Sequence, residues 1–227
     1  MRTQVKENYD RRMREEIRRM QAEKPLPLLL LHACCAPCSS ACLERLRQDF
    51  LVTVFYYNPN IDREPEYRKR LAEEKRLIEA FNRQVEERDY RGMLFEEGAQ
   101  RIGIIEGDYR PAVFHEAVRG LEQEPEGGLR CNACFRLRLR EAARVAAEGQ
   151  FDCFTTTLTI SPLKDADRLN RIGQEAGEAF GVPFLPSDFK KRDGFKRSIE
   201  LSKRFDLYRQ DHCGCSYSLR ASQYPPA

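Results

Sequence analysis

Two adjacent cysteines, Cys34 and Cys35, lie in the motif HACCAPC (32–38), which directly follows the apolar run 28–31. Neighbouring cysteines cannot easily form a disulfide with each other. On a strand or helix their side chains also point in different directions, so the pair can serve two sites. Cys38 and Cys42 follow within seven residues. The pattern of the segment predicts a turn from a buried strand into a helix. This concentration of thiols predicts metal or redox chemistry at that turn.

Composition limits the class of protein. The 227 residues suit one domain, and the net charge of +3, from 39 basic and 36 acidic residues, does not by itself require a nucleic-acid partner. No apolar stretch is long enough to span a bilayer, and the charged N-terminus lacks a signal-peptide core, so we expect a cytoplasmic protein without a membrane partner. In that reducing compartment nine cysteines favour metal or redox sites over disulfides.

Strands and helices alternate along the chain. We expect strands over 28–33, 51–57, 84–87, 151–157 and 182–185, and helices over 5–23, 38–49, 64–81, 132–147, 165–180 and 195–205. This alternation predicts an α/β fold with a parallel, doubly wound sheet of about five strands flanked by helices. We expect one catalytic domain over 1–220, which begins with a charged helix within 1–24, and a disordered tail over 221–227.

In a sheet of this kind, sites form at the carboxyl ends of the strands, where the strand order reverses. The turns at 34–38 and 155–161 both follow expected strands, so both are candidates for this crevice. We therefore expect a cysteine-rich metal site at that edge of the sheet.

The cysteines fall into three clusters, which are Cys34, Cys35 and Cys38, then Cys131 and Cys134, then Cys213 and Cys215. A [4Fe–4S] cluster or a structural zinc takes four thiolates, so these seven cysteines can supply two centres. A structural zinc bound only by Cys131, Cys134, Cys213 and Cys215 is the simpler alternative, but it leaves the Cys34–Cys35 pair unexplained. Cys42 and Cys153 fit buried apolar positions better than ligand positions.

Several longer motifs resemble one known family, the cobalamin-independent epoxyqueuosine reductases of the QueH type. They are LLLHACCAPCSS (29–40), YYNPNI with Glu66 and Tyr67 (56–67), PEGGLRCNACFRLRL (125–139), TTLTISP (156–162), PSDFKK (186–191) and YRQDHCGCSYSL (208–219). The resemblance covers most of the chain. His212 stands where an aromatic residue is more typical of the family.

The resemblance implies a Rossmann-like fold of the HUP type, in which cysteines replace the phosphate loop after the first strand. It also implies an iron–sulfur oxidoreductase that reduces epoxyqueuosine to queuosine at the wobble position of tRNAs with GUN anticodons. The cofactors it implies are a [4Fe–4S] cluster and a second, mononuclear metal, expected to be iron. The electrons come from an external donor.

On this basis we assign Cys35, Cys131, Cys134 and Cys213 to the cluster, and Cys34, Cys38 and Cys215 to the second metal. The choice within each neighbouring pair is open, as is whether Cys213 and Cys215 form a disulfide during turnover. The proton donor is expected among Asp188, Asp108, Tyr109 and His212, with Asp188 preferred because it follows an expected strand.

Binding of tRNA requires basic surface despite the small net charge. Arginines flank the second cysteine cluster, and a basic run follows the PSDFKK motif with phenylalanines interleaved, a pattern that suits phosphates and a splayed base. The predicted tRNA-binding residues are Arg130, Arg136, Lys190, Lys191, Arg192, Lys196 and Arg197.

Three other functions remain open from the residues alone. A sulfur-transfer or adenylating tRNA enzyme on a related fold needs an ATP loop, which we do not find. A zinc-binding, RNA-binding module needs only four of the thiols. A thiol–disulfide oxidoreductase using Cys131 and Cys134 lacks its usual sequence context.

Overall fold

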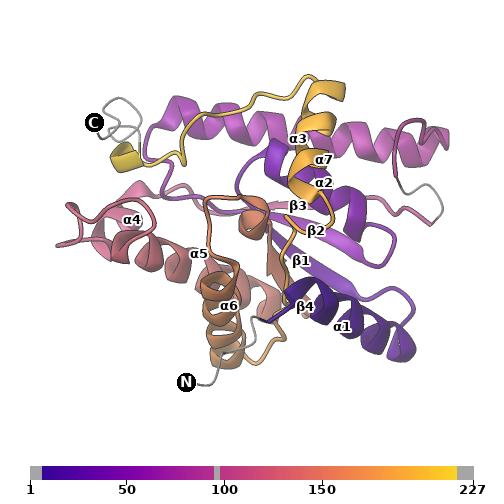
Figure 1. Ribbon diagram of the computed structural model, residues 1–227, viewed down its shortest axis with the longest axis horizontal. Helices are drawn as coiled ribbons and strands as arrows, with labels where there is room; N and C mark the ends of the chain where they lie inside the picture. Colours follow the sequence, from indigo (N-terminus) through magenta and orange to yellow (C-terminus); the bar gives the residue numbers. More distant parts are fainter. Residues whose placement is uncertain (1–6, 95–97, 219–227) are drawn as a thin grey trace.

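The computed structural model describes residues 7–94 and 98–218, and a parallel four-stranded sheet lies at its centre (Figure 1). The strand order is β3-β2-β1-β4. In the register, Leu28 of β1 lies beside Leu51 of β2, and Leu29 lies beside Cys153 of β4. The strands are β1 (Leu28–Ala33), β2 (Leu51–Tyr56), β3 (Gly103–Glu106) and β4 (Cys153–Thr156).

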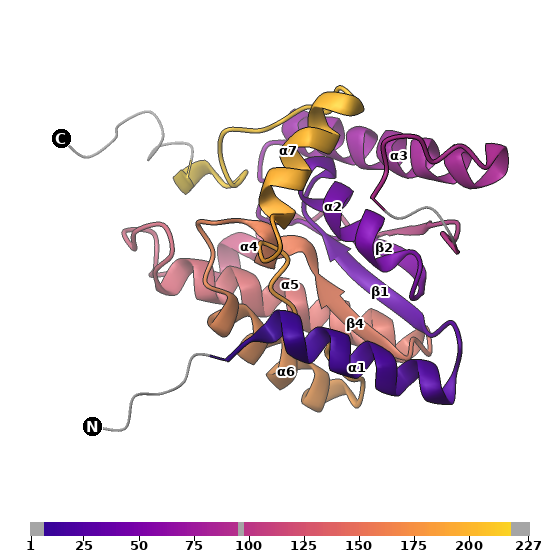
Figure 2. The same cartoon turned by 45° about the vertical axis from the view of Figure 1, so that its right-hand side comes forward.

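Helices cover both faces of the sheet (Figure 2). One face packs against α1 (Tyr9–Glu23), α2 (Ala36–Leu46), α3 (Glu64–Glu87) and α7 (Gly194–Arg204). The other packs against α5 (Leu129–Glu148) and α6 (Ala166–Phe180), and the short helix α4 (Pro111–Ala117) packs on α5. A 3₁₀ turn, η1 (Thr157–Ile160), follows β4.

The central strand β1 explains why the leucine run is continuous. Leu29 and Leu31 pack into the core below α1, α2, α3 and α7, whereas Leu30 packs into the core below α5 and α6. A parallel strand that is buried on both faces needs apolar residues at successive positions. β1 therefore lies in the middle of the fold and carries its carboxyl end to the site.

The chain leaves β1 at the point where the strand order reverses. The α2 connection leads to β2 on one side of β1, and β4 pairs with β1 on the other side. Cys35 is the N-cap of α2, and Pro37 lies in its first turn, where a missing backbone N–H costs nothing. Cys34, Cys35 and Cys38 therefore lie at the switch point at which α/β sheets bind ligands.

The parallel α/β fold is confirmed, with four strands where about five were expected. The expected strand over 84–87 is wrong, because α3 continues to Glu87 and the third strand is β3. Residues 182–185 form only one bridge to β4, through Phe184. β3 and α4 were not expected.

The charged N-terminal helix is confirmed as α1. The expected tail over 221–227 lies outside the described residues. Across the two described ranges, no helix is long and apolar enough to cross a membrane.

Candidate metal centre

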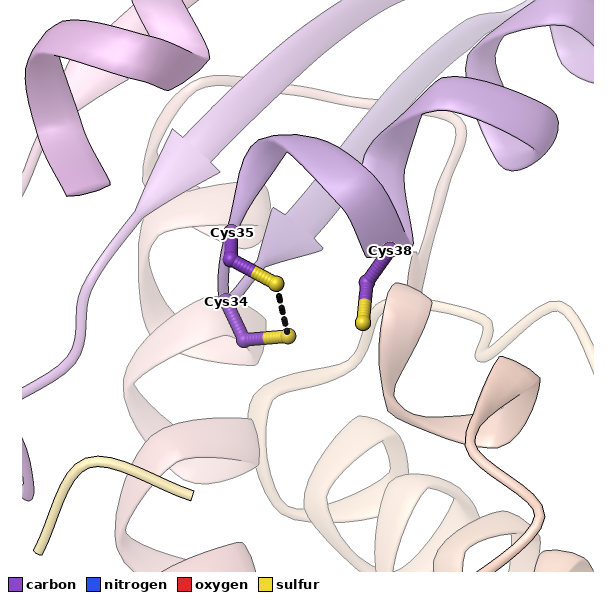
Figure 3. A group of neighbouring side chains, drawn as sticks. All are labelled: Cys34, Cys35 and Cys38. Atoms are coloured by element: carbon purple, nitrogen blue, oxygen red, sulfur yellow. Dashed lines mark hydrogen bonds between the residues drawn. The ribbon is translucent and has the colours of Figure 1, made fainter. Parts of the chain in front are cut away.

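The first cysteine cluster forms one compact group of thiols at the end of β1 (Figure 3). The Sγ atoms of Cys34, Cys35 and Cys38 all lie within 4.8 Å of one another. The sulfur atoms of Cys34 and Cys35 are 3.7 Å apart, because the backbone turns between the strand and the N-cap of α2. The adjacent pair therefore faces one space, in contrast to the divergent directions expected for a regular strand or helix.

Hydrogen bonds among these three thiols shift their pKa values in different directions. Hydrogen bonds from Cys35 and Cys38 lower the pKa of Cys34 well below its usual value. The same hydrogen bonds raise the pKa of Cys35, and they raise that of Cys38. Cys34 is therefore the thiol of the three that ionises first, and a thiolate is the form that binds metals. Gln210 also donates from Nε2 to the Cys35 sulfur at 2.7 Å.

The other four predicted ligand cysteines line a second, smaller cavity. Cys131 and Cys134 are one turn apart at the start of α5. Cys213 and Cys215, from the C-terminal segment, line the same cavity. Burial raises the pKa of Cys134 to about 12. The first of the two thiol-lined cavities, hereafter the larger cavity, is lined by Cys34, Cys38 and also Cys213. Six of the seven predicted ligand cysteines therefore line two adjoining cavities, and Cys35 is buried beside Cys34.

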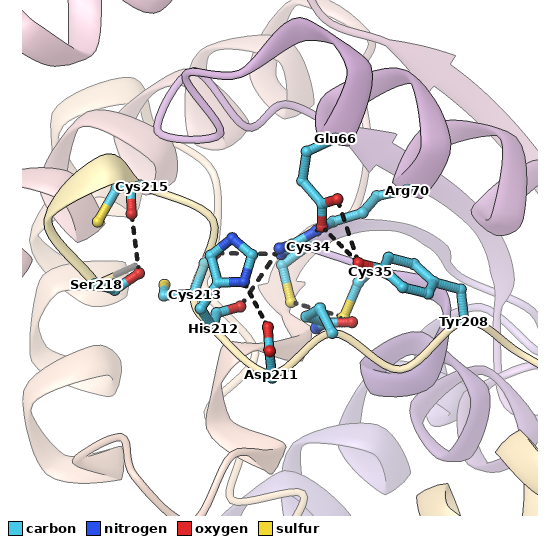
Figure 4. Close-up of polar contacts among 11 residues, drawn as sticks. Cys34, Cys35, Glu66, Arg70, Tyr208, Asp211, His212, Cys213, Cys215 and Ser218 are labelled. Carbon is cyan, nitrogen blue, oxygen red and sulfur yellow. Dashed lines mark hydrogen bonds and ion pairs between the residues drawn. The ribbon is translucent and has the colours of Figure 1, made fainter. Parts of the chain in front are cut away.

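Arg70 of α3 holds the C-terminal segment in place (Figure 4). Its guanidinium donates to the backbone oxygens of Cys213 at 3.2 Å and His212 at 3.4 Å. The same side chain pairs with Glu66 at 2.6 Å, and Glu66 also accepts a hydrogen bond from the Tyr208 hydroxyl. One buried arginine thus attaches this segment to the body of the fold.

Gly214, between the last two cysteines, is required by the turn. Its φ of +111° belongs to the left-handed region that favours glycine. A Cβ atom at this position would lie 2.8 Å from Ile61 and 3.2 Å from Arg70. A side chain at this position would therefore strain the turn that carries the two cysteines and crowd Ile61 and Arg70.

Two cations, Arg138 and Lys164, lie among the thiols. Both line the larger cavity with Cys34 and Cys213. In the described part of the chain, no carboxylate forms an ion pair with either cation. Burial works against the charged form of each, but the neighbouring thiolates outweigh it and raise the pKa of both side chains. Neither cation was among the predicted ligands or proton donors.

His32, at the end of β1, is a hydrogen-bond partner of Arg138. Its imidazole is fully buried, with Nδ1 2.9 Å from the Thr156 hydroxyl, and its Nε2 accepts a hydrogen bond from Arg138 Nε at 3.3 Å. Burial, with Arg138 nearby, lowers the pKa of His32 to about 3. The imidazole is therefore neutral and is a structural partner, not an acid.

Of the four predicted proton donors, His212 lies on the wall of the larger cavity, with Nδ1 2.7 Å from Asp211 Oδ1. Asp188 lines a neighbouring cavity instead and pairs with Lys190 at 3.0 Å. Asp108 is exposed, and Tyr109 stacks on Tyr67 with ring centroids 4.0 Å apart. The catalytic roles of these residues stay predictions.

The predicted tRNA-binding residues differ in exposure. Arg130 is 5% exposed and lies over the Tyr217 ring, so its side chain is committed to packing. Arg197 pairs with Glu44 at 2.6 Å. Arg136 pairs with Glu175, and Lys190 with Asp188. Of the seven predicted residues, Lys191, Arg192 and Lys196 are exposed and form no ion pair within the described ranges.

The chemistry of the donor set fits the implied metals. All nine cysteines are free thiols, so none is committed to a disulfide. Cys42 and Cys153 are buried in the apolar core and line neither thiol-lined cavity. Clustered soft sulfur donors favour zinc or iron–sulfur centres over hard cations such as Mg²⁺. Two unpaired cations beside them are suited to balancing negatively charged metal–thiolate groups.

Residues 29–221 match the family model described as "Epoxyqueuosine reductase QueH". Proteins of the same name are similar over most of this chain. That of Streptococcus pyogenes serotype M1 is 38% identical over 213 residues, 94% of this chain and 78% of the relative. The chain belongs to the epoxyqueuosine reductase QueH family. The family resemblance read from the sequence motifs is thereby confirmed.

Further relatives carry the same name. The QueH protein of Staphylococcus epidermidis is 38% identical over 93% of this chain and 84% of its own. That of Thermotoga maritima is 29% identical over 84% of this chain and 90% of its own. The range matched to the QueH family includes every cysteine of both cavities, whereas α1 precedes it.

Proposed function

We propose that the chain reduces the epoxide of epoxyqueuosine in tRNA and leaves the alkene of queuosine. Membership of the QueH family makes it an oxidoreductase of tRNA queuosine biosynthesis. The substrate in this proposal is a tRNA with a GUN anticodon that carries epoxyqueuosine at the wobble position. An external donor supplies the electrons, and the reaction takes place in the cytoplasm.

The chemistry requires both electrons and protons. Conversion of an epoxide to an alkene breaks two C–O bonds, consumes two electrons and two protons, and releases the oxygen as water. A [4Fe–4S] cluster would supply electrons one at a time, and a second metal with an open position would act as a Lewis acid on the oxygen. The chain itself must bind the base, exclude water and deliver the protons.

The grouping of the thiols supports two centres. Cys131, Cys134, Cys213 and Cys215 line one cavity, and four thiolates complete the ligand set of a [4Fe–4S] cluster. The compact group of Cys34, Cys35 and Cys38 supplies three ligands, which leaves an open position on a second metal, here proposed to be iron. This division differs from the one based on sequence, which placed Cys35 with the cluster and Cys215 with the second metal.

The larger cavity is the proposed site of the modified base. Its volume of about 380 Å³ lies in the range of small-ligand pockets, about 300–1,000 Å³. Cys34 and Cys38 form one wall, and Lys164 and His212 face the same space. Lys164 Nζ, charged and close to the thiols, is suited to give a proton to the departing oxygen. His212, oriented by Asp211, is a second proton donor.

A route for the tRNA backbone leads away from this cavity. Pro162 and Lys164 line both the larger cavity and the neighbouring one, which also holds Lys191. The exposed residues Arg192 and Lys196 continue the basic surface from there. We propose that the splayed wobble base enters the larger cavity while phosphates of the anticodon loop lie along this surface.

The two adjoining thiol-lined cavities carry the proposal, and anaerobic purification followed by an assay tests it. The wild-type chain should hold about five irons and about four sulfides, and should convert epoxyqueuosine tRNA to queuosine tRNA with dithionite as reductant. Cys153→Ala, in the core, is the matched control and should behave as wild type.

One zinc per chain without iron would overturn this proposal. It would instead favour the second candidate, a structural zinc on the four-cysteine cavity, in an RNA-binding module. The same group of four thiols fits both metals, so metal analysis separates them.

A further inference from the structure

Arg138 is a buried cation with only neutral partners among the hydrogen bonds of the described chain. It is 1% exposed. Nε donates to the neutral imidazole of His32 at 3.3 Å, and Nη2 donates to the side-chain oxygen of Asn58 at 2.5 Å. Asn58 in turn donates to the backbone oxygen of Ala33 at 2.8 Å. This network fixes the orientation of the guanidinium and leaves its charge uncompensated.

The position of Arg138 on α5 relates it to the cysteines. Cys131, Cys134 and Arg138 follow one another at i, i+3 and i+7, so one face of the helix presents two thiols and the cation together. Arg138 also lines the larger cavity with Cys34 and Cys213. It therefore lies where the two groups of thiols meet.

Two other fully buried arginines of the described chain have different surroundings. Arg70 pairs with the Glu66 carboxylate at 2.6 Å. Arg47 lies over the Phe81 ring with its guanidinium carbon 4.6 Å from the ring centroid, and it donates to the Phe81 backbone oxygen. Arg138 has neither a carboxylate nor an aromatic face in the described residues. The thiolates are the anions left to balance it.

We infer that Arg138 is the built-in countercharge of the metal centre and sets its reduction potential. This inference rests on the proposed function. One-electron reduction adds a negative charge beside a fixed positive one in a poorly solvated site, so the guanidinium favours the reduced state. Arg138 acts through the centre and is a positioning and tuning residue; it is not a proton donor.

Anaerobic redox titration followed by visible and EPR spectra tests this role, because it reads the centre and not the reaction. The variants are Arg138→Met, which removes the charge, and Arg138→Lys, which keeps it. The matched control is Arg144→Met, on the same helix, whose side chain pairs with Glu141 and Glu148 instead of facing the thiols.

At the midpoint potential of the wild type, the ratio of reduced to oxidised centre should fall at least tenfold in Arg138→Met, equivalent to about 59 mV for one electron. In Arg138→Lys this ratio should stay within about threefold of the wild-type value. In Arg144→Met it should equal the wild-type value. A centre that assembles in Arg138→Lys but not in Arg138→Met would also support the countercharge.

An unchanged ratio in Arg138→Met with an intact centre would overturn the inference. So would failure of both Arg138 variants to hold iron, because charge would then not be the property that matters. A wild-type chain without iron would overturn the proposed function, and the inference with it.

Discussion

The two halves of the metal site are held by different kinds of structure. Cys34, Cys35 and Cys38 extend directly from β1, whose Leu31 and Ala33 are fully buried in the middle of the sheet. Cys213 and Cys215 lie on an irregular segment that Arg70 attaches through two backbone oxygens. The first half is part of the core, whereas the second is attached to it.

This difference separates stability from assembly of the site. Damage to the β1 half should unfold the protein, because its ligands share the packing that stabilises the sheet. Damage to the C-terminal half should leave the fold and remove the ligands, because few buried apolar contacts depend on that segment. Gly214→Ala and Leu31→Ala distinguish these outcomes.

The largest effect is expected for Gly214→Ala in the attached half. The new methyl group collides with Ile61 and Arg70, and it also opposes the positive φ. Activity should fall on the order of 100-fold, since a displacement of about 1 Å at a reactive site costs that much. The free energy of unfolding of the metal-free protein should fall only by the strain of a side chain at this positive φ, about 1–2 kcal/mol.

Gly120→Ala is the matched control for this prediction. Gly120 also has a positive φ, +79°, but a Cβ there would meet nothing within 4 Å. It should share the backbone cost and keep its iron and activity. Equal losses in the two variants would mean that the steric fit of Gly214 does not position the cysteines.

The β1 half should respond with lost stability. Leu31→Ala removes a fully buried side chain from the core and should lower the free energy of unfolding by about 2–5 kcal/mol, measured by urea denaturation of the reduced, metal-free protein. Leu51→Ala, at a position 38% exposed, should cost about 0.5 kcal/mol or less. A small loss in Leu31→Ala would contradict the view that these ligands are part of the core.

The smallest effect depends on pH and concerns Glu74 of α3. This carboxyl group is fully buried, neither of its oxygens has a hydrogen-bond partner, and burial raises its pKa to about 8. Because its pKa in the unfolded chain is about 4.3, the folded state must hold a proton that the unfolded chain releases. The stability that this group contributes is therefore complete below about pH 4.3 and is lost as the pH rises through 8.

Glu74→Gln removes this dependence. At pH 8.5 the metal-free variant should be more stable than wild type by at least about 1.4 kcal/mol, the equivalent of one pKa unit, and the two should agree near pH 4.3. Glu73→Gln should behave in the opposite sense, because the Arg76 ion pair lowers the pKa of Glu73 and its carboxylate stabilises the fold at high pH. The same pH profile in both variants would contradict the burial argument.

The same contrast explains what the sequence could predict. The β1 half is one continuous motif, so its strand, its turn and its three thiols are predictable from neighbouring residues. Residues 84–87 were misassigned because one valine among strong helix formers does not end α3. Residues 182–185 remain a single bridge partly because Pro183 has no N–H to donate to a sheet. β3 is short and begins with a glycine, which weakens its strand pattern.

Within the site, the thiols were predictable and their charge balance was not. Cysteine spacing is visible in the sequence, but the positions of Arg138 and Lys164 depend on how α5 and the loop after η1 meet β1. The signal for Arg138 was its spacing from Cys131 and Cys134 on one helix face. Lys164 follows the TTLTISP motif by two residues and has no comparable local signal.

Cysteine replacement followed by anaerobic reconstitution tests most directly whether two thiol groups hold two centres. Visible spectra, with iron and sulfide counts, should show that Cys134→Ala loses the cluster absorbance. Cys35→Ala should keep that absorbance but lose about one iron and the activity, and Cys153→Ala should match wild type. Loss of the cluster absorbance in Cys35→Ala would contradict this division and support the one based on sequence.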